Sequence, residues 1–416
     1  MNSRETETSA HQTADAVARR SYGKLVAFLA ARTRDVAAAE DALSDAFASA
    51  LTDWPRSGCP SNPEGWLLTV ARRKIIDRIR GQRRHELAAD ELRIMAEGLE
   101  EAVNHAQIPD QRLALMFACA HPSIDASTRA PLILQTVLGF DGAMIASAFL
   151  IAPATMSQRL VRAKNKIRRA GIPFRIPERD ELARRLDAVL DAIYAAFAEG
   201  WSDAAGTDAA RREFAEETTF LGRLVTELLP DQPEALGLFA LMLYAESRRR
   251  ARRSPTGDYI PLDEQDPTLW DSAMIEEAET LLSRASALRS IGRYQLEAAL
   301  QSAHVHRRRT GRANWTEVVQ LYDALLALCG SPVVAINRAV AVAHVESARA
   351  GLDALQEVAA DARLAEYQPY WAARAELLAQ TGSYGEARQA YEVAIGLERD
   401  PAVRRFLQQR QYALAP

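Results

Sequence analysis

The chain has few of the residues on which secreted and membrane proteins depend. It contains three cysteines, Cys59, Cys119 and Cys329, whose odd number and wide separation argue against a disulfide framework. No apolar stretch approaches the roughly 20 residues of a membrane span, and residues 1–18 lack the basic and then apolar pattern of a signal peptide. We therefore expect a cytoplasmic protein without membrane contact.

The motifs of common enzyme classes are also missing. The chain has no G-x-x-x-x-G-K-S/T, no G-x-S-x-G and no G-x-G-x-x-G. Cys119 lies close to His121, and His304 lies close to His306, but neither pair has a second pair at the spacing of a zinc site. We expect no metal, no cofactor and no enzymatic activity.

Composition favours helices over strands. Hydrophobic residues make up 48% and charged residues 25% of the 416 positions, and alternating β-branched runs are nearly absent. The sequence therefore predicts an all-α protein. Because a single domain usually holds about 100–200 residues, two or three domains are expected.

Charge is unevenly distributed along the chain. Residues 1–176 hold 24 Lys and Arg against 19 Asp and Glu, a net charge of +5, whereas residues 177–416 hold 27 against 36, a net charge of −9. The first part can approach nucleic acid, and the second would be repelled by it.

Residues 153–169 carry six Lys or Arg and no acid, in a segment that predicts a helix. Pro153 suits the first helical position. With a preceding short helix at 141–149, the segment predicts a helix-turn-helix closed by 171–173, whose polar faces are free to meet the major groove. Four apolar residues recur at the spacing of one buried helical face: Met156, Leu160, Ala163 and Ile167.

Residues 16–84 predict a second helical unit. Apolar residues recur at helical spacing in its first half, which we expect to end at Trp54-Pro55. A loop rich in Pro, Ser and Gly covers 55–65. A helix with an Arg-rich outer face, which includes Arg78, Arg83 and Arg84, follows over 66–84.

Beyond residue 177 the sequence predicts paired helices separated by Gly and Pro. Residues 371–397 match the offsets of a tetratricopeptide (TPR) repeat, and two further pairs, over 293–328 and around 337–341, are weaker copies. Since one pair cannot bury its own apolar face, stacked pairs in a TPR-like α-solenoid are expected. The residues at the repeat offsets are Trp371, Ala375, Gly382, Tyr384, Ala387, Tyr391 and Ala394.

Three segments together resemble a known family. DVAAAEDALSDAFASA (35–50), GWLLTVARRKIIDRIRGQRR (65–84) and the predicted helix-turn-helix are similar, in order and spacing, to regions 2 and 4 of bacterial extracytoplasmic-function sigma factors. AGIPFRIP (170–177) and SPVVAINRAVAVA (331–343) resemble a subgroup with a long TPR-containing extension. The resemblance implies promoter-specific transcription initiation, with core RNA polymerase and promoter DNA as partners.

The resemblance also implies how the chain is divided. Residues 85–108 hold six acids and one Arg and are expected to form an acidic linker. The expected parts are sigma region 2 over 1–84, the linker over 85–109, sigma region 4 over 110–176, and the helical extension over 177–416.

Region 2 of such a factor binds core polymerase. The acids near the start of the 35–50 segment suit a basic coiled-coil partner, although an ordinary solvated helix face would show the same spacing. The predicted polymerase-binding residues are Asp35, Glu40, Asp41, Asp45 and Phe47.

The resemblance implies that 66–84 opens the −10 element. Guanidinium groups can follow the phosphates of a melted strand, and Trp66 can receive an unstacked base, although an anchor in the core explains Trp66 equally well. Arg73 stands where many of these factors carry Asn, so their base preference is not transferred. The predicted −10 residues are Trp66, Arg72, Arg73, Lys74, Asp77 and Arg80.

Region 4 of such a factor reads the −35 element. Arg pairs bidentately with guanine and Gln with adenine. The other cations, Lys164, Lys166, Arg168 and Arg169, are expected to contact phosphate or to remain solvated. The predicted −35 residues are Ser157, Gln158, Arg159, Arg162 and Lys166.

Two questions stay open at this point. The Arg run at 248–253 suits nucleic acid or an acidic partner, but such runs more often form a solvated face or pair within their own acidic domain. The extension is expected to regulate activity, through an intramolecular contact or a protein partner. The alternative function is a helix-turn-helix regulator whose TPR-like domain senses a ligand or partner and which never engages polymerase.

Overall fold

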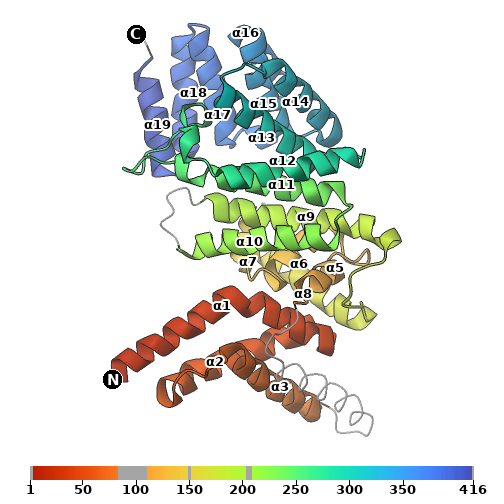
Figure 1. Ribbon diagram of the computed structural model, residues 1–416. Helices are drawn as coiled ribbons and strands as arrows, with labels where there is room; N and C mark the ends of the chain where they lie inside the picture. The colour runs from red at the N-terminus through yellow and green to blue at the C-terminus, as the bar shows by residue number, and fades with distance from the viewer. Residues whose placement is uncertain (1–2, 83–109, 149–150, 203–208, 415–416) are drawn as a thin grey trace. The chain divides into compact units, whose positions relative to one another are not determined.

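The computed structural model of the chain describes residues 3–82, 110–148, 151–202 and 209–414. Within these ranges helix follows helix (Figure 1), and the only β geometry is the isolated bridge between Arg253 and Tyr259. The predicted all-α fold class is confirmed. Over the same ranges, no helix is both long enough and apolar enough to cross a membrane.

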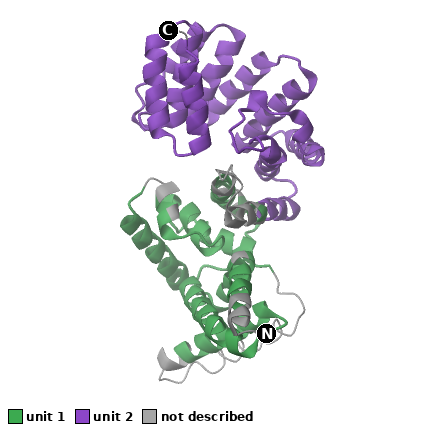
Figure 2. Ribbon diagram, turned by 90° about the vertical axis from the view of Figure 1, so that its left-hand side faces the viewer, with its two compact units in different colours: residues 1–200, 209–218 green, residues 201–208, 219–416 purple. Residues whose placement is uncertain are grey.

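The chain forms two compact units (Figure 2). Unit 1 comprises 1–200 and 209–218, and unit 2 comprises 201–208 and 219–416. The expected acidic linker at 85–109, together with Arg83, Arg84 and Phe149, lies outside the described residues.

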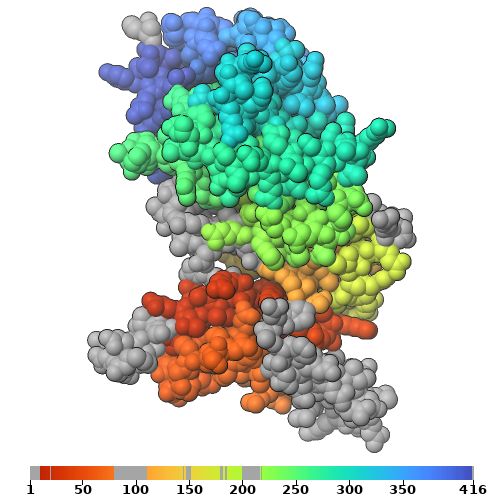
Figure 3. Space-filling view, viewed as in Figure 1, coloured from red at the N-terminus to blue at the C-terminus, as the bar shows by residue number. Residues whose placement is uncertain are grey.

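Unit 1 begins with three helices that pack on one another. The turn between the first two is fixed by Asp35, whose carboxylate accepts a hydrogen bond from the Ala38 amide at 3.1 Å and caps the second helix. The space-filling view shows the first two helices as adjoining surfaces, red beside orange (Figure 3). The three helices are α1 (Ser3–Thr33), α2 (Val36–Ser57) and α3 (Pro63–Gln82).

The expected end of the second helix at Trp54-Pro55 is wrong. Helix α2 continues through Pro55 to Ser57, and the Gly58 amide donates to the Trp54 carbonyl at 3.0 Å. Pro55 cannot donate a backbone hydrogen bond, and the turn that contains it is closed by the bond from Gly58 to Trp54. Trp54 is fully buried, so packing holds this last turn in place.

A second group of helices in unit 1 packs on α1. Every residue of α5 is buried, and α5 and α6 both contact α1. The predicted apolar face of 153–169 is confirmed, since Met156, Leu160, Ala163 and Ile167 are all buried. The helices are α5 (Arg112–Cys119), α6 (Ala126–Thr136), α7 (Gly142–Ala148), α8 (Pro153–Ala170) and α9 (Arg179–Ser202), followed by α10 (Ala209–Leu228), which starts in unit 1.

Unit 2 is a succession of helices, most of which pack mainly on their neighbours in the chain. The structure bears out helices at the three predicted pairs, 293–328, 337–341 and 371–397. Its longer helices are α11 (Pro233–Ser247), α12 (Ser272–Ala287), α13 (Arg293–Thr310), α14 (Trp315–Cys329), α15 (Pro332–Val345), α16 (Ala348–Gln356), α17 (Gln368–Gln380), α18 (Tyr384–Leu397) and α19 (Pro401–Tyr412). Single 3₁₀ turns lie at Arg249–Ala251, Leu262–Glu264, Pro267–Leu269 and Ala362–Leu364.

The residues predicted at TPR offsets lie in the pair α17–α18. Ala375, Ala387, Tyr391 and Ala394 are buried in one cluster, and Trp371 packs against it. Gly382 has a φ of +80°, which only glycine adopts easily, and it forms the turn between the helices. Tyr384, the first residue of α18, is exposed. These contacts fit a helical hairpin, and membership of the TPR class remains a prediction.

The Arg run at 248–253 forms contacts within unit 2. Arg248 is buried and donates to the Tyr244 carbonyl at 3.2 Å and to Gln301 Oε1 at 2.6 Å. Arg249 pairs with Glu246 at 2.6 Å, and Arg253 pairs with Asp400 at the start of α19. The run therefore links α11, α13 and α19. This favours pairing within its own domain over binding to nucleic acid or to an acidic partner.

Unit 2 is expected to lose stability in mild acid through His304. This histidine lies edge-on to Trp315 at 6.2 Å, and burial, reinforced by Arg307 and Arg248, lowers its pKa to about 4. In the unfolded chain His304 binds a proton near pH 6.5, whereas in the folded chain it does so only near pH 4. Stability is therefore full above pH 6.5 and falls between pH 6.5 and about 4, by on the order of 2 kcal/mol.

Urea unfolding at a series of pH values tests this expectation. His304→Gln should lessen the decline between pH 6.5 and 4 that the wild type shows, because glutamine does not titrate, whereas His344 beside Trp315, whose pKa burial also lowers, keeps part of it. Parallel pH profiles for the two proteins would contradict the assignment.

Candidate nucleic-acid interface

Helix α8 is held by local features at both ends. Pro153 occupies the first turn, and Gly171, with a φ of +59°, ends the helix in a left-handed turn. The Gly171 amide donates to the Arg168 carbonyl, and the Ile172 amide donates to the Ile167 carbonyl. Since the buried face is wholly apolar, all six cations of α8 lie on its flanks or its outer face.

One flank of α8 contacts α2. Lys164 Nζ lies 2.6 Å from Glu40 Oε2, and Arg168 Nη1 lies 3.3 Å from Asp35 Oδ2. The first pair is nearly enclosed, with side-chain exposures of 12% for Lys164 and 16% for Glu40. The structure thus joins two predicted polymerase-binding acids to two predicted phosphate-binding cations, which sequence reasoning had placed in separate sites.

The enclosure of this pair changes the electrostatics of Glu40. Burial raises the pKa of the Glu40 carboxyl, and the nearby Asp41 and Asp35 act in the same direction, whereas Lys164 opposes them. Burial, together with Glu40 and Asp41, raises the pKa of Tyr22 on α1 to about 12. Lys164 therefore offsets part of the free energy that burial of the Glu40 carboxylate costs.

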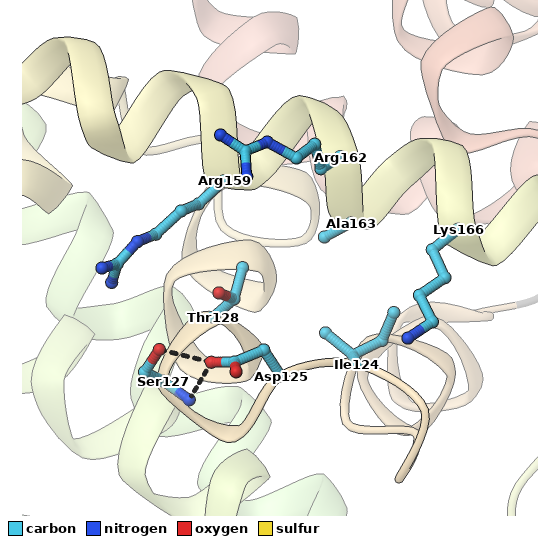
Figure 4. Close-up of a pocket in the computed structure, with 8 residues that line it drawn as sticks. All are labelled: Ile124, Asp125, Ser127, Thr128, Arg159, Arg162, Ala163 and Lys166. Carbon is cyan, nitrogen blue, oxygen red and sulfur yellow. Dashed lines mark hydrogen bonds between the residues drawn. The ribbon is translucent and has the colours of Figure 1, made fainter.

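The other flank of α8 faces α6 across a cavity of about 300 Å³ (Figure 4). Arg159, Arg162 and Lys166 line it from α8, and Figure 4 shows Asp125 and Ser127 at the start of α6 opposite them. Asp125 accepts hydrogen bonds from the amide and hydroxyl of Ser127, which lower the pKa of its carboxyl. Three predicted −35 residues therefore share one side of α8.

The outer face of α8 carries Ser157 and Gln158, both exposed, and Gln158 Oε1 accepts a hydrogen bond from Arg162 Nη2 at 3.2 Å. Sequence reasoning missed Val161, whose side chain is 59% exposed on this face. The available signal was that Val161 is apolar yet lies outside the i, i+3, i+4 pattern of the buried face. An apolar side chain there can contact the methyl group of thymine.

The remaining predicted polymerase-binding residues point elsewhere. Asp41 pairs with Arg78 of α3 at 2.9 Å, and both side chains are well exposed, so the pair adds little stability. Asp45 is exposed. Phe47 is half-buried, with its ring 6.5 Å from that of Tyr22, and it lines an apolar cavity of about 510 Å³ with Leu51. The acids of α2 therefore do not share a single face.

The predicted −10 residues lie along α3. Trp66 is half-buried and packs edge-to-face on the buried Trp54, with ring centroids 5.5 Å apart. This contact supports the core-anchor interpretation while part of the indole stays accessible. Arg73, Lys74 and Asp77 are exposed, and Arg72 is half-buried. Arg80 lies in the last turn of α3, and its side chain is outside the described part of the structure.

Helix α3 begins at a defined point beside the 58–62 loop. The Asn62 side chain accepts a hydrogen bond from the Gly65 amide at 3.0 Å, and Pro63 fills the first helical position. This cap fixes Trp66 and the cations that follow it relative to the loop. Among the described residues, no group of three or more His, Cys, Asp or Glu side chains could hold a metal ion.

Comparison with known proteins gives matches in both halves of the chain. Residues 17–85 match sigma-70 region 2, and residues 185–286 match a family of unknown function (DUF6596). An uncharacterized protein of Rhizobium meliloti (strain 1021) is 38% identical over 370 residues, covering 88% of this chain and 87% of that protein. No solved structure matches the chain. The chain therefore belongs to the sigma-70 family of transcription initiation factors, in a group that it shares with the Rhizobium meliloti protein.

Proposed function

We propose that the protein is an extracytoplasmic-function sigma factor that directs core RNA polymerase to specific promoters. Helices α1–α3 bind polymerase and open the −10 element, and α7–α8 read the −35 element as a helix-turn-helix. The observation that carries the proposal is an acid-free helix with six cations off its buried face, in the same compact unit as sigma-70 region 2. Such work on promoters agrees with the expected cytoplasmic location.

Polymerase binding is supported by the surface of α2. Phe47 and Leu51 present apolar surface beside a cavity, and Asp45 adds an exposed carboxylate on the same helix. Apolar contact gives affinity, and carboxylates steer a basic partner into register. A helix of the polymerase with apolar and basic residues would match this surface.

Reading of the −35 element is supported by how the polar and basic side chains of α8 are distributed around the helix. Gln158 lies on the outer face and Arg162 reaches it from the α6 side, so both can meet the base edges there. Arg159 and Lys166 lie along the α6 side, where phosphates flank a helix in the major groove. Val161, exposed on the same helix, adds an apolar contact suited to thymine.

The helical extension is proposed to regulate this activity. Its helices pack in series, as TPR-like repeats do, and residues 177–416 carry the net charge of −9. An acidic domain on the same chain as basic DNA-binding helices is suited to an intramolecular regulatory contact. The alternative of a simple helix-turn-helix regulator leaves sigma-70 region 2 without a role.

Run-off transcription with purified core polymerase tests the central proposal. We expect a promoter-dependent transcript with the protein and none with core polymerase alone. Asp45→Lys should lower the transcript about fivefold or more, because it reverses a charge that meets a basic partner. Equal transcription with and without the protein would refute a sigma factor function.

Two substitutions on α8 separate base reading from phosphate contact. With holoenzyme and a promoter it selects, Arg162→Ala should cost about 1–3 kcal/mol of binding on the native −35 sequence and little on a shuffled one. Lys166→Ala, the matched control, should weaken both and reduce the slope of log K against log salt by about 1. Equal losses on both DNAs for Arg162→Ala would argue against base reading.

Removing the extension tests its regulatory role. Arg185 of α9 is buried and donates to the Phe117 carbonyl of α5 at 3.4 Å, so a cut near residue 180 would damage unit 1. A chain that ends at Thr218 keeps all of unit 1. We expect its run-off transcription to differ from that of the full chain by about threefold or more, and an unchanged output would remove the regulatory role.

A further inference from the structure

We propose that the groove between α12 and α13 binds an extended peptide segment of a protein partner, in which a basic and an acidic side chain stand three residues apart. The proposal rests on the regulatory role proposed for the extension, and it names the chemical class of the partner. Both helices belong to unit 2, so the groove is complete within one compact unit.

The groove forms because α12 and α13 each pack more extensively on α11 than on each other. Gly237 of α11 permits the approach of α13, since a Cβ atom at this position would lie 2.6 Å from the backbone nitrogen of Gln295. The space between α12 and α13 has a volume of about 720 Å³, which is within the size range of ligand sites. Ala299 and Ala303 line it with small side chains, which leave room for a peptide backbone.

Two hydrogen bonds across the groove fix the register of its walls. Ser302 of α13 donates to Glu279 of α12 at 2.8 Å, and Arg309 of α13 donates to Ser272 of α12 at 2.9 Å. Residues 272 and 279 therefore lie opposite 309 and 302, and the two helices run antiparallel. The two bonds are two helical turns, or about 10 Å, apart along each wall.

In both bonds a charged group meets a neutral hydroxyl. Glu279 and Arg309 are exposed and are held in place, but within the described part of the chain neither has an ion-pair partner. Other arginines of unit 2, such as Arg338 and Arg410, pair with carboxylates. The groove therefore presents an unpaired acid on one wall and an unpaired base on the other, which a ligand with both charges can satisfy.

The positions of these two charges select an extended chain. Extended residues rise about 3.3 Å each, so three of them cover the roughly 10 Å between Glu279 and Arg309 along the groove. Side chains three apart in an extended chain point to opposite sides, as groups on opposite walls require. In a helical peptide they would share one face and be only about 4.5 Å apart along the axis.

The length of the groove favours a chain over separate small ions. From Ala299 to Thr310 the α13 wall covers about 16 Å, which corresponds to about five extended residues. Glu276 lies on the same wall as Glu279, so a cation of the peptide can meet two carboxylates. The net charge of −9 on residues 177–416 also attracts the basic end of such a segment.

Fluorescence anisotropy of labelled hexapeptides with the full-length chain at low salt tests the spacing. The probe peptides are blocked at both ends and carry Lys-Ala-Ala-Glu or Glu-Ala-Ala-Lys, because a chain can enter the groove in either direction. The control peptides have the same composition with one alanine fewer between the charges. We expect one probe to bind about fivefold tighter than its control. Equal binding of probes and controls overturns the inference.

Charge reversal in both protein and peptide separates recognition from a loss of stability. Arg309→Glu should weaken binding of the probe about fivefold, and a peptide with lysine in place of its glutamate should restore it. Glu279→Lys should respond in the same way to a peptide with glutamate in place of its lysine. The matched controls, Arg388→Glu and Glu386→Lys at exposed positions of α18, should change the affinity less than about twofold. Loss of binding that no altered peptide restores overturns the inference.

Free lysine and free glutamate in about tenfold excess over the probe test the other occupant, separate small ions. We expect no displacement of the probe, because neither amino acid spans both charges. Displacement by the two amino acids assigns the groove to small ions and overturns the peptide assignment.

Run-off transcription separates failure of the inference from failure of the proposed function. The chain that ends at Thr218 lacks both α12 and α13. If its transcription differs from that of the full chain while the probes do not bind, the inference is overturned and the regulatory role stands. If its transcription is unchanged, the regulatory role is overturned, and the charge-reversal result decides the groove by itself.

Discussion

Unit 1 depends on a stretch of α1 that is buried on every side. Residues 25–30 have no exposed surface, which a helix attains only when neighbours cover its whole circumference. Helices α2 and α3 pack on α1, and so do α5 and α6. Each of Leu25, Phe28 and Leu29 contributes roughly 1.5–3 kcal/mol through burial. The helices matched to sigma-70 region 2 and those that carry α8 therefore stabilise one another in this arrangement.

That shared core brings opposite charges together. Once α5 and α6 lie against α1, α8 lies against α2, and Lys164 and Arg168 meet Glu40 and Asp35. The enclosed pair gains from a low dielectric surrounding, but it also loses the hydration of two charges, so its net stability is modest.

Unit 2 uses its charges differently. Arg248, Arg249 and Arg253 bind groups of their own domain, so a run that looked suited to nucleic acid is part of the internal framework. The sequence could not choose between these outcomes, because the partners Gln301 and Asp400 are far away in the chain. What distinguishes the runs at 153–169 and 248–253 is burial, which follows from packing.

The sequence by itself determined the elements and their apolar faces. Helical periodicity identified the buried residues of α8, and turn residues such as Pro153 and Gly171 marked its ends. The order of motifs pointed to the sigma-70 family, which the match to region 2 bears out. These features are local, because they depend on spacing within one or two turns of helix.

Only the tertiary structure decided which functional side chains meet. Periodicity places Lys164 off the buried face of α8 and Glu40 beside Phe47 on α2, but the contact between them spans 124 positions. It follows from how α5 and α6 pack on α1, including a close approach that Gly23 alone permits. The end of α2 beyond Pro55 was settled in the same way, by the packing of Trp54, which no local pattern encodes.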